Sequence, residues 1–478
     1  MAQTPSEKPQ SPLEQLTQPF IDLIHAPRAL WGINLAYFLE GWVYFGMLGY
    51  LAMHFSDFIF RGVPDADVHS HHMVMILTAG ITISMFFLGQ VADKFGVRKT
   101  LLLAFVFLIV GRVIISAAPL FFEPDGLDSP LQFMTMGGIL FVVIGYGMYQ
   151  PAAYAGVRKF TGPKTAAMGF AMLYALMNLG GMLPMGSFLL RDTLGLGITG
   201  TYWFYTILTG VALFSTYTIL TKRVAREAAD RAEQERAANA AAEKGESGVA
   251  EAPVVDEKPA VKVDRSLMER LVHYITHHPF RDLRFTFFIF ALIPVQTLFT
   301  YNWLILPQYI NRSYTGWIGE KFEVASNFNP LLIFIAVPII TALTQKNDVY
   351  RMMILGTFIM GAPAFLLAVG TNGWLLFGYL VIMTIGEAMW QPRFLQYAAE
   401  IAPEGRTGEY MGVAQLPWFL TKMLVPFYSG HMLSRYVPAE GEINPQGMWL
   451  IFSLIAISTT VLLVIAKGWV TKDFKTKA

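Results

Sequence analysis

Long apolar runs separated by short polar connections dominate this chain. Runs of about 20 residues, the length of a helix that crosses a bilayer, recur twelve times. A polar segment divides them into two sets of six, so the pattern predicts an all-α membrane protein with 12 transmembrane helices in two six-helix bundles. The predicted spans lie near residues 30–54, 70–92, 98–122, 131–157, 166–190, 200–221, 284–311, 328–345, 350–369, 373–399, 409–435 and 447–468.

The polar segments set the expected domain organisation. We expect an N-terminal segment (1–28), a first bundle (29–221), a linker (222–283), a second bundle (284–469) and a C-terminal tail (470–478). Within the linker, residues 223–236 favour a helix that extends span 6. Residues 243–264 are typical of a flexible connection. A capping box at Ser266 predicts a short amphipathic helix on the membrane surface. The linker is interpreted as a tether; a docking site for a regulator is the alternative.

Composition supports a membrane protein. The chain is 54% hydrophobic and 14% charged, with a mean hydropathy of +0.46. It has no cysteine, which excludes disulfides and thiol chemistry. Basic residues follow the even-numbered spans, so the positive-inside rule predicts that both termini are cytoplasmic. The compact loops favour a bacterial inner membrane, and the net charge of +1 suggests no nucleic-acid partner.

The second apolar run is followed by a patterned loop, G-x-x-x-D-[RK]-x-G-x-[RK]-[RK]. This loop resembles the one between spans 2 and 3 of the major facilitator superfamily, which implies the major facilitator fold and a transporter. A weak echo at residues 345–351 lies where a two-fold repeat would place it. The resemblance implies a gating role for the residues of the loop, which are Gly89, Asp93, Lys94, Gly96, Arg98 and Lys99.

Charged residues within the predicted spans are candidates for the mechanism, because a charge at membrane depth is costly and is usually functional. They are Glu40, Arg112, Glu387, Arg393 and Lys422, with His431 as a further candidate. Arg112 could instead reach the membrane surface or bind backbone carbonyls, and Lys422 could form a structural ion pair with Glu387 or Glu40.

Several spans resemble the proton-dependent oligopeptide transporter family. The matching patterns are Gly386-Glu387 followed by Pro392, Phe170-x3-Tyr174-x3-Asn178-x-Gly180, Asn329-Pro330, and Gly145-x-Gly147-x2-Gln150-Pro151. The resemblance implies a pocket near the membrane midplane in which Glu387 holds a substrate's amino group. The substrate-binding residues it implies are Tyr44, Gln150, Tyr174, Asn178, Gln296, Asn329 and Glu387.

The chain departs from that family at its cationic positions. Gly41 stands where the family has Arg in span 1, and Gln150 stands where it has Lys in span 4. Both losses remove the usual partners of a substrate carboxylate. Two acids remain as carriers of protons, Glu40 and Glu387, with Arg112 and Lys422 as candidate charge partners.

Three histidines, His69, His71 and His72, open span 2 on the outer side. A solvated loop is the preferred interpretation, and metal binding or pH sensing is the alternative.

The sequence therefore predicts a secondary active transporter that moves a peptide-like or amine-bearing solute, coupled to protons, by alternating access. It has no nucleotide-binding loop and no enzyme motif, and we expect a monomer in the lipid bilayer with no cofactor or metal. The alternatives are an exporter of another small molecule, such as a drug or a siderophore, and a membrane sensor that does not transport.

Overall fold

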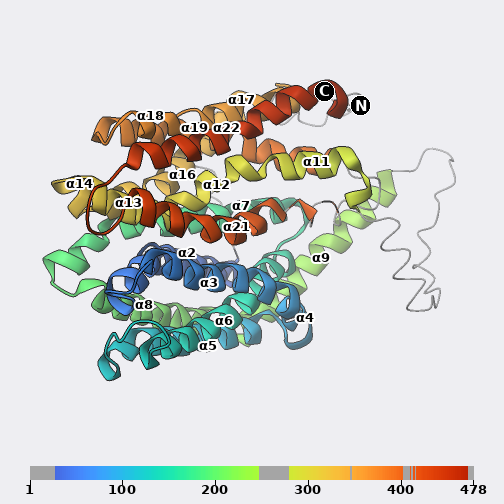
Figure 1. Ribbon diagram of the computed structural model, residues 1–478. Coiled ribbons are helices and arrows are strands. Elements are labelled where there is room, and N and C mark those ends of the chain that lie inside the picture. The colour runs from blue at the N-terminus through green and yellow to red at the C-terminus, as the bar shows by residue number, and fades with distance from the viewer. Residues whose placement is uncertain are drawn as a thin grey trace.

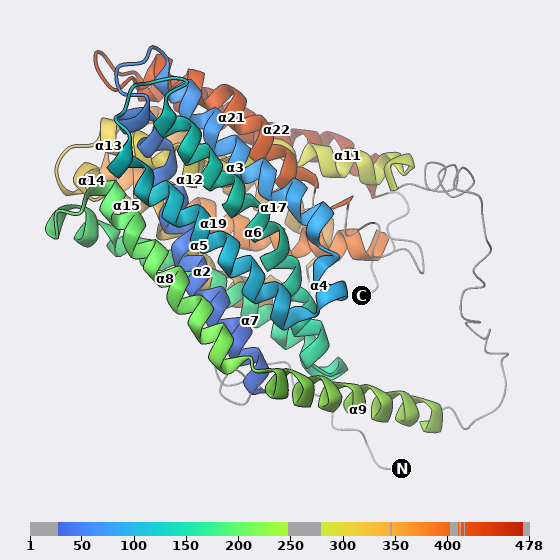
Figure 2. The ribbon, with the colours of Figure 1, turned by 90° about the horizontal axis from the view of Figure 1, so that it is seen from below.

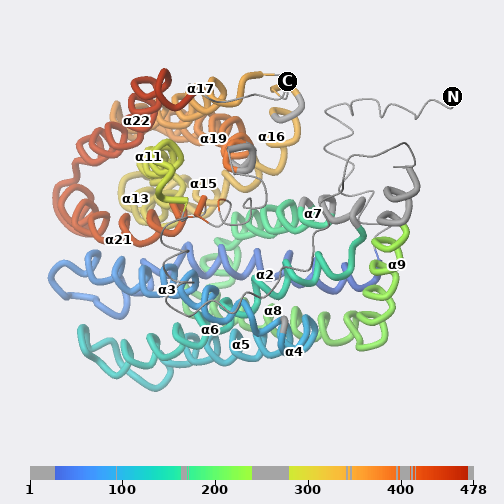
Figure 3. The backbone as a smooth tube through the Cα atoms, turned by 90° about the vertical axis from the view of Figure 1, so that its right-hand side faces the viewer, coloured from blue at the N-terminus to red at the C-terminus, as the bar shows by residue number. Residues whose placement is uncertain are grey.

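The computed structural model describes residues 27–246, 279–344, 347–401, 410, 413–414 and 416–471, and these residues form helices and loops without a β-strand. The predicted surface helix at Ser266 and the first two residues of the echo at 345–351 lie outside the described residues. The helices form two groups that pack side by side (Figures 1 and 3).

The N-terminal group contains the helices between residues 28 and 246. These are α2 (Arg28–Met53), α3 (Ala66–Leu88), α4 (Val91–Phe95), α5 (Val97–Phe121), α6 (Pro130–Phe160), α7 (Pro163–Met182), α8 (Gly197–Ile219) and α9 (Lys222–Glu246). Short π- or 3-10 helices follow α2 and α7: η1 (His54–Ile59), η2 (Leu183–Gly186) and η3 (Leu189–Thr193).

The C-terminal group contains the helices between residues 279 and 471. It opens with η4 (Pro279–Arg281) and continues with α11 (Leu283–Ala291), α12 (Ile293–Leu304), α13 (Leu306–Ser313), α14 (Trp317–Glu320), α15 (Phe322–Ser326), α16 (Phe328–Thr344), α17 (Val349–Gly361), α18 (Ala364–Val369), α19 (Gly373–Ile401), α21 (Leu416–Tyr436) and α22 (Pro445–Val470).

Local sequence signals set the helix ends. Ser129 caps α6, since its side chain accepts a hydrogen bond from the backbone N–H of Gln132, and Pro130 occupies the first helical position.

Small residues allow close packing inside the N-terminal group. A Cβ at Gly111 of α5 would lie 2.5 Å from the carbonyl oxygen of Gly138 in α6, so only glycine lets these backbones touch.

Length and composition identify the membrane-crossing helices. Nine helices in the described residues are long and apolar enough to cross a membrane, or ten if α8 and α9 count as one bent span. The chain is therefore an integral, multi-pass membrane protein. The polar residues of α2 and α21, which carry Glu40 and Lys422, keep both helices out of the nine. The total of twelve stays a prediction.

Three predicted spans differ from the structure in continuity. Span 7 is divided into α11, α12 and α13, with prolines in the first turn of α12 and of α13. Span 9 is divided at Pro363 into α17 and α18. The helix predicted to extend span 6 is present as α9, but a bend of 64° separates it from α8.

The two groups meet mainly where α3 packs against α21 and α7 against α16, with further contacts of α2 with α12 and α13 and of η2 with α15. A Cβ at Gly430 of α21 would lie 2.6 Å from the Cα of Val68 in α3, so these backbones are in contact.

The patterned loop and α9 lie at one end of the molecule, here called the loop end (Figure 2). The opposite end, where Ser434 of α21 contacts Asp65 before α3, is called the far end.

Candidate functional site

The patterned loop adopts the turn that its second glycine predicts. Gly96 has a φ of 81°, in the region that favours glycine, and it lies between α4 and α5. Arg98 donates a hydrogen bond to the carbonyl oxygen of Leu220 (2.6 Å) and lies over the ring of Tyr217, which ties α5 to the end of α8. Lys94 and Lys99 are exposed, and Gly89 ends α3 close to α6. The side chain of Asp93 lies outside the described residues.

Glu40 of α2 and Arg112 of α5 form a buried ion pair inside the N-terminal group. The Arg112 Nη1 is 3.0 Å from Glu40 Oε2, and its Nη2 forms a second, short bond to Oε1. Arg112 also donates to the hydroxyls of Thr209 (2.5 Å) and Tyr146 (2.9 Å), and the Tyr146 hydroxyl donates to Glu40. Both charged side chains are at most 1% exposed. Of the two predicted charge partners, the structure therefore pairs Glu40 with Arg112.

Glu387 of α19 is held by neutral groups within the C-terminal group. It accepts hydrogen bonds from Asn329 Nδ2 (2.8 Å) and from Gln391 Nε2 (3.3 Å), and it is 2% exposed. Asn329 donates in addition to Thr384 (3.0 Å). In the described part of the chain Glu387 forms no ion pair, so the alternative in which Lys422 forms a structural ion pair with Glu387 is not present.

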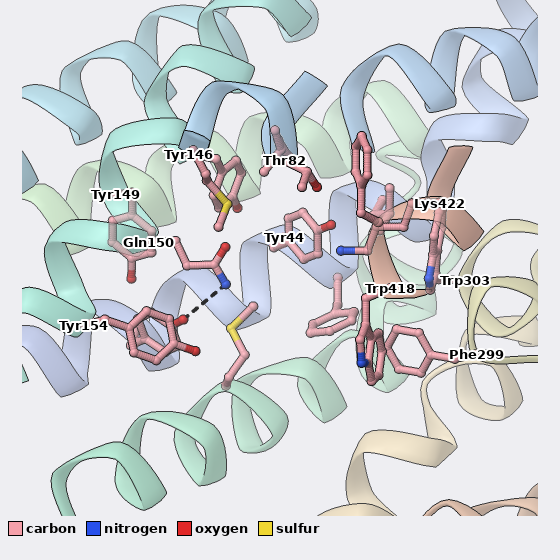
Figure 4. Close-up of a pocket in the computed structure, with 17 residues that line it drawn as sticks. Tyr44, Thr82, Tyr146, Tyr149, Gln150, Tyr154, Phe299, Trp303, Trp418 and Lys422 are labelled. Carbon is pink, nitrogen blue, oxygen red and sulfur yellow. Dashed lines mark hydrogen bonds between the residues drawn. The ribbon is translucent and has the colours of Figure 1, made fainter. Parts of the chain in front are cut away.

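A cavity of about 410 Å³ lies between the two helix groups (Figure 4). Its volume falls in the range of pockets for small organic ligands. Tyr44 and Gln150, two of the predicted substrate residues, line it, and Gln150 Nε2 donates to the Tyr37 hydroxyl (3.4 Å). The lining residues are Tyr37, Tyr44, Phe45, Leu48, Ile81, Thr82, Met85, Tyr146, Tyr149, Gln150, Tyr154, Met177, Phe299, Trp303, Trp418, Phe419 and Lys422.

The other predicted substrate residues are not in this lining. Asn178 uses its amide to bond the carbonyl oxygen of Tyr174 in its own helix (2.9 Å), and the Tyr174 ring is 48% exposed. Gln296 is buried in α12, and its amide has no hydrogen-bond partner among the described residues. Asn329 donates a hydrogen bond to Glu387, and neither residue is in the lining. The expected convergence of all seven residues is therefore not present in this conformation.

Several lining residues were not among the predicted substrate-binding residues, although Lys422 was named as a candidate charge partner. Trp418 and Lys422 are four residues apart in α21, so they share one helix face, and this spacing was a readable signal. Phe299 and Trp303 show the same spacing in α12. Their common direction toward the N-terminal group depends on how the helices pack, which the spacing does not reveal.

Polar side chains join the two groups at the far end. Arg312 of α13 binds Asp67 of α3 with two hydrogen bonds (2.6 and 2.8 Å). Gln308 donates to Asp67 (3.1 Å) and to Ser56 (2.9 Å), and Arg191 pairs with Glu323 (2.7 Å). These contacts tie the two groups together at the far end.

His71 is part of the far-end contacts, and the prediction that it lies in a solvated loop is wrong. Its ring is fully buried, with Nδ1 2.7 Å from Ser429 Oγ and Nε2 3.0 Å from Gln308 Oε1. Since the Gln308 amide nitrogen donates elsewhere, its oxygen accepts from His71 Nε2–H, and Nδ1 accepts from the Ser429 hydroxyl. The ring is thus a neutral bridge between α3, α13 and α21. No group of three or more metal-binding side chains occurs among the described residues.

A central cavity between two packed groups of membrane helices, which polar contacts join at one end, is the architecture of a membrane transporter. The family model of the Major Facilitator Superfamily matches residues 30–426, and the chain belongs to this family. The family is one of transporters and not of enzymes.

Comparison with individual proteins agrees with this assignment. The chain is 26% identical over 179 residues to the uncharacterized MFS-type transporter YttB of Bacillus subtilis (strain 168), which is 36% of this chain and 44% of that protein. The match thus spans less than half of the length of this curated relative.

Solved structures show the same fold at low identity. A crystal structure of the peptide transporter POT in complex with alafosfalin has a TM-score of 0.68 at 16% identity, with 93% of this chain and 95% of that chain covered. A crystal structure of a D-xylose-proton symporter has a TM-score of 0.66 at 15% identity, with 91% and 96% covered. The similarity to peptide transporters that the sequence suggested is therefore present in the fold.

Proposed function

We propose that this protein is a proton-coupled secondary transporter that carries a small organic solute through the central cavity by alternating access. The observation that carries the proposal is the cavity itself, which is lined by both helix groups, together with the far-end contacts that join the two groups. A relative movement of the two groups that breaks these contacts would expose the cavity to the opposite side. The loop residues Gly89 to Lys99 would latch the loop end in the alternative state.

Two buried acids support proton coupling. Glu387 is buried and bonded to neutral amides, with no ion pair among the described residues, so we infer that it takes up and releases a proton as the site becomes hydrated. Glu40 forms an ion pair with Arg112, and the arrival of a proton at this pair would weaken it and free Arg112. We therefore assign the first role to Glu387 and a switch role to the Glu40–Arg112 pair.

A peptide-like or amine-bearing solute, the class implied by the resemblance, would need Glu387 to reach the cavity. In this conformation its carboxylate is bonded to Asn329 and Gln391 instead. Recognition of an amine by Glu387 would thus belong to another state of the cycle, whereas proton transfer requires only that water reaches the carboxylate.

The test is a proton-flux assay in proteoliposomes that contain a pH-sensitive dye. A panel of peptides, amines and organic acids is added under an imposed membrane potential, and solute-driven acidification identifies a coupled solute. We expect Glu387→Gln to abolish solute-driven proton flux and to change solute binding by less than about threefold, because Glu387 does not line the cavity. Glu320→Gln, which removes an exposed acid in α14, is the matched control.

Two results would contradict the proposal. Solute binding without translocation under any imposed gradient would favour a sensor. Solute transport at the same rate with and without a proton gradient would remove proton coupling. Flux only out of right-side-out vesicles would identify an exporter of the same mechanism.

A further inference from the structure

Among the described residues, a cation and no acid line the central cavity. Lys422 of α21 lines it, and neither aspartate nor glutamate is among its described lining residues. We infer that the cavity binds an organic anion that carries an aromatic ring, with the anionic group on Lys422 and the ring between aromatic side chains of both helix groups. This inference rests on the proposed transport function and names the solute class for it.

Lys422 has no partner in the described part of the chain. Its backbone carbonyl accepts a bond from Thr78 (3.4 Å), but its ammonium forms neither an ion pair nor a side-chain hydrogen bond. The side chain is half-buried, and its nitrogen points into the cavity in the same region as the Tyr44 hydroxyl (Figure 4). A lone ammonium at membrane depth is unfavourable, and an anion placed beside it would relieve this cost.

The nearby acids of the protein are already engaged elsewhere. Glu40 is paired with Arg112, Asp67 with Arg312 and Glu323 with Arg191. Glu387 is bonded to neutral amides outside the cavity lining. The field in the cavity is therefore set by Lys422, which attracts a carboxylate and repels an ammonium.

Aromatic rings form the walls around this cation. Tyr44 and Tyr146 of the N-terminal group meet edge to face with centroids 5.2 Å apart. Phe299 and Trp418 of the C-terminal group meet in the same way at 5.0 Å. A planar aromatic solute can stack or pack edge-on against such rings, and it would contact both groups at once.

Gln150 offers a polar contact on the N-terminal side of the cavity. Its amide nitrogen donates to Tyr37, and its carbonyl oxygen accepts no side-chain hydrogen bond from a described residue. A solute with an N–H or O–H group on its ring can donate to that oxygen. The set of one cation, aromatic walls and one amide acceptor fits an aromatic carboxylate with a polar ring substituent.

The experiment is isothermal titration calorimetry on the full chain in lipid nanodiscs, with indole-3-acetate and tryptamine as probes. Both carry an indole, and they differ in the sign of the charged group. We expect indole-3-acetate to bind at least about tenfold more tightly than tryptamine. Lys422→Met should weaken the acid by roughly 10- to 100-fold, the usual loss for a hydrogen bond to a charged group. Lys422→Arg should stay within about fivefold.

Two further variants keep the test decisive. Lys467→Met, which removes an exposed lysine of α22, is the matched control and should bind as the parent chain does. If Lys422→Met does not give folded protein, Gln150→Glu places an acid in the cavity without removing the lysine. That variant should weaken indole-3-acetate and improve tryptamine. Comparison of 3-phenylpropionate with 3-cyclohexylpropionate tests the ring, and the aromatic acid should bind roughly 2- to 10-fold more tightly.

The outcomes separate this inference from the transport proposal. Equal or tighter binding of tryptamine, an acid affinity unchanged by Lys422→Met, or no binding of any aromatic carboxylate in the panel would overturn the inference. Lys422-dependent binding of aromatic acids without uptake into proteoliposomes would support the inference and contradict transport. Uptake of a peptide or amine that does not depend on Lys422 would support transport and contradict the inference.

Discussion

Replacing Glu40 by Gln removes the negative charge from the buried ion pair with Arg112 while keeping the size of the side chain. Arg112 then remains buried, with an amide in place of a carboxylate. One of the two hydrogen bonds to Arg112 is lost, because the amide nitrogen of Gln is a donor and cannot accept from a guanidinium N–H. Breaking a buried pair by removing one partner costs about 3–5 kcal/mol.

The expected loss can be measured as a shift of the unfolding temperature. An unfolding entropy of roughly 2.1 cal/mol/K per residue over 478 residues gives about 1 kcal/mol per kelvin, so Glu40→Gln should lower Tm by about 3–5 °C. Arg112→Gln should lower it by a similar amount, since it leaves Glu40 buried and unpaired. The double variant should be more stable than the sum of the two losses predicts, because it leaves no uncompensated charge.

The assay is differential scanning fluorimetry of the four proteins in one detergent, arranged as a double-mutant cycle. Losses below about 1 °C for both single variants, or strictly additive losses, would refute the view that this ion pair holds α2 and α5 together. Thr218→Val, which removes an exposed hydroxyl of α8, serves as a control without expected effect.

Two further predictions concern the far end and helix packing. Asp67→Asn should weaken the contacts that hold the far end together. A reporter cysteine, Thr82→Cys in this cysteine-free chain, should then react about 10- to 100-fold faster with an impermeant maleimide added outside cells than it does without Asp67→Asn. Asp125→Asn is the control, and equal rates with and without Asp67→Asn would contradict the closing role. Gly386→Ala should destabilise the protein by about 1–3 kcal/mol, because the new Cβ would lie 2.2 Å from the backbone nitrogen of Met360, whereas Gly378→Ala in the same helix should be nearly neutral in a thermal-unfolding assay.

Helix positions followed well from the sequence. An apolar run of sufficient length can only bury its backbone polar groups in a helix when it lies in lipid, so the hydropathy pattern located nearly every long helix. The breaks inside spans 7 and 9 follow from prolines, which remove a backbone donor, but the sequence did not show which prolines would interrupt a helix. Pro151, Pro338 and Pro392 lie inside continuous helices.

The candidate site was predicted in part. The resemblance to peptide transporters placed Tyr44 and Gln150 in the pocket, and both line the cavity. It also placed Glu387 there, and the structure instead bonds it to Asn329. His71 was assigned to solvent from its position near a helix start, whereas partners in α13 and α21 bury it.

The sequence alone determined that this is a membrane transporter of the Major Facilitator Superfamily type, that it carries the patterned loop, and that few charges lie at membrane depth. These properties depend on local composition and spacing. The tertiary structure decided which charges meet. Glu40 and Arg112 are 72 residues apart and pair, while Lys422 is left facing the cavity. Such pairing depends on the rotation and contact of helices distant in the chain, and hydropathy is insensitive to both. Gly41 and Gln150 stand where the resembled family has cations, and the structure places a different cation, Lys422 of α21, on the cavity lining.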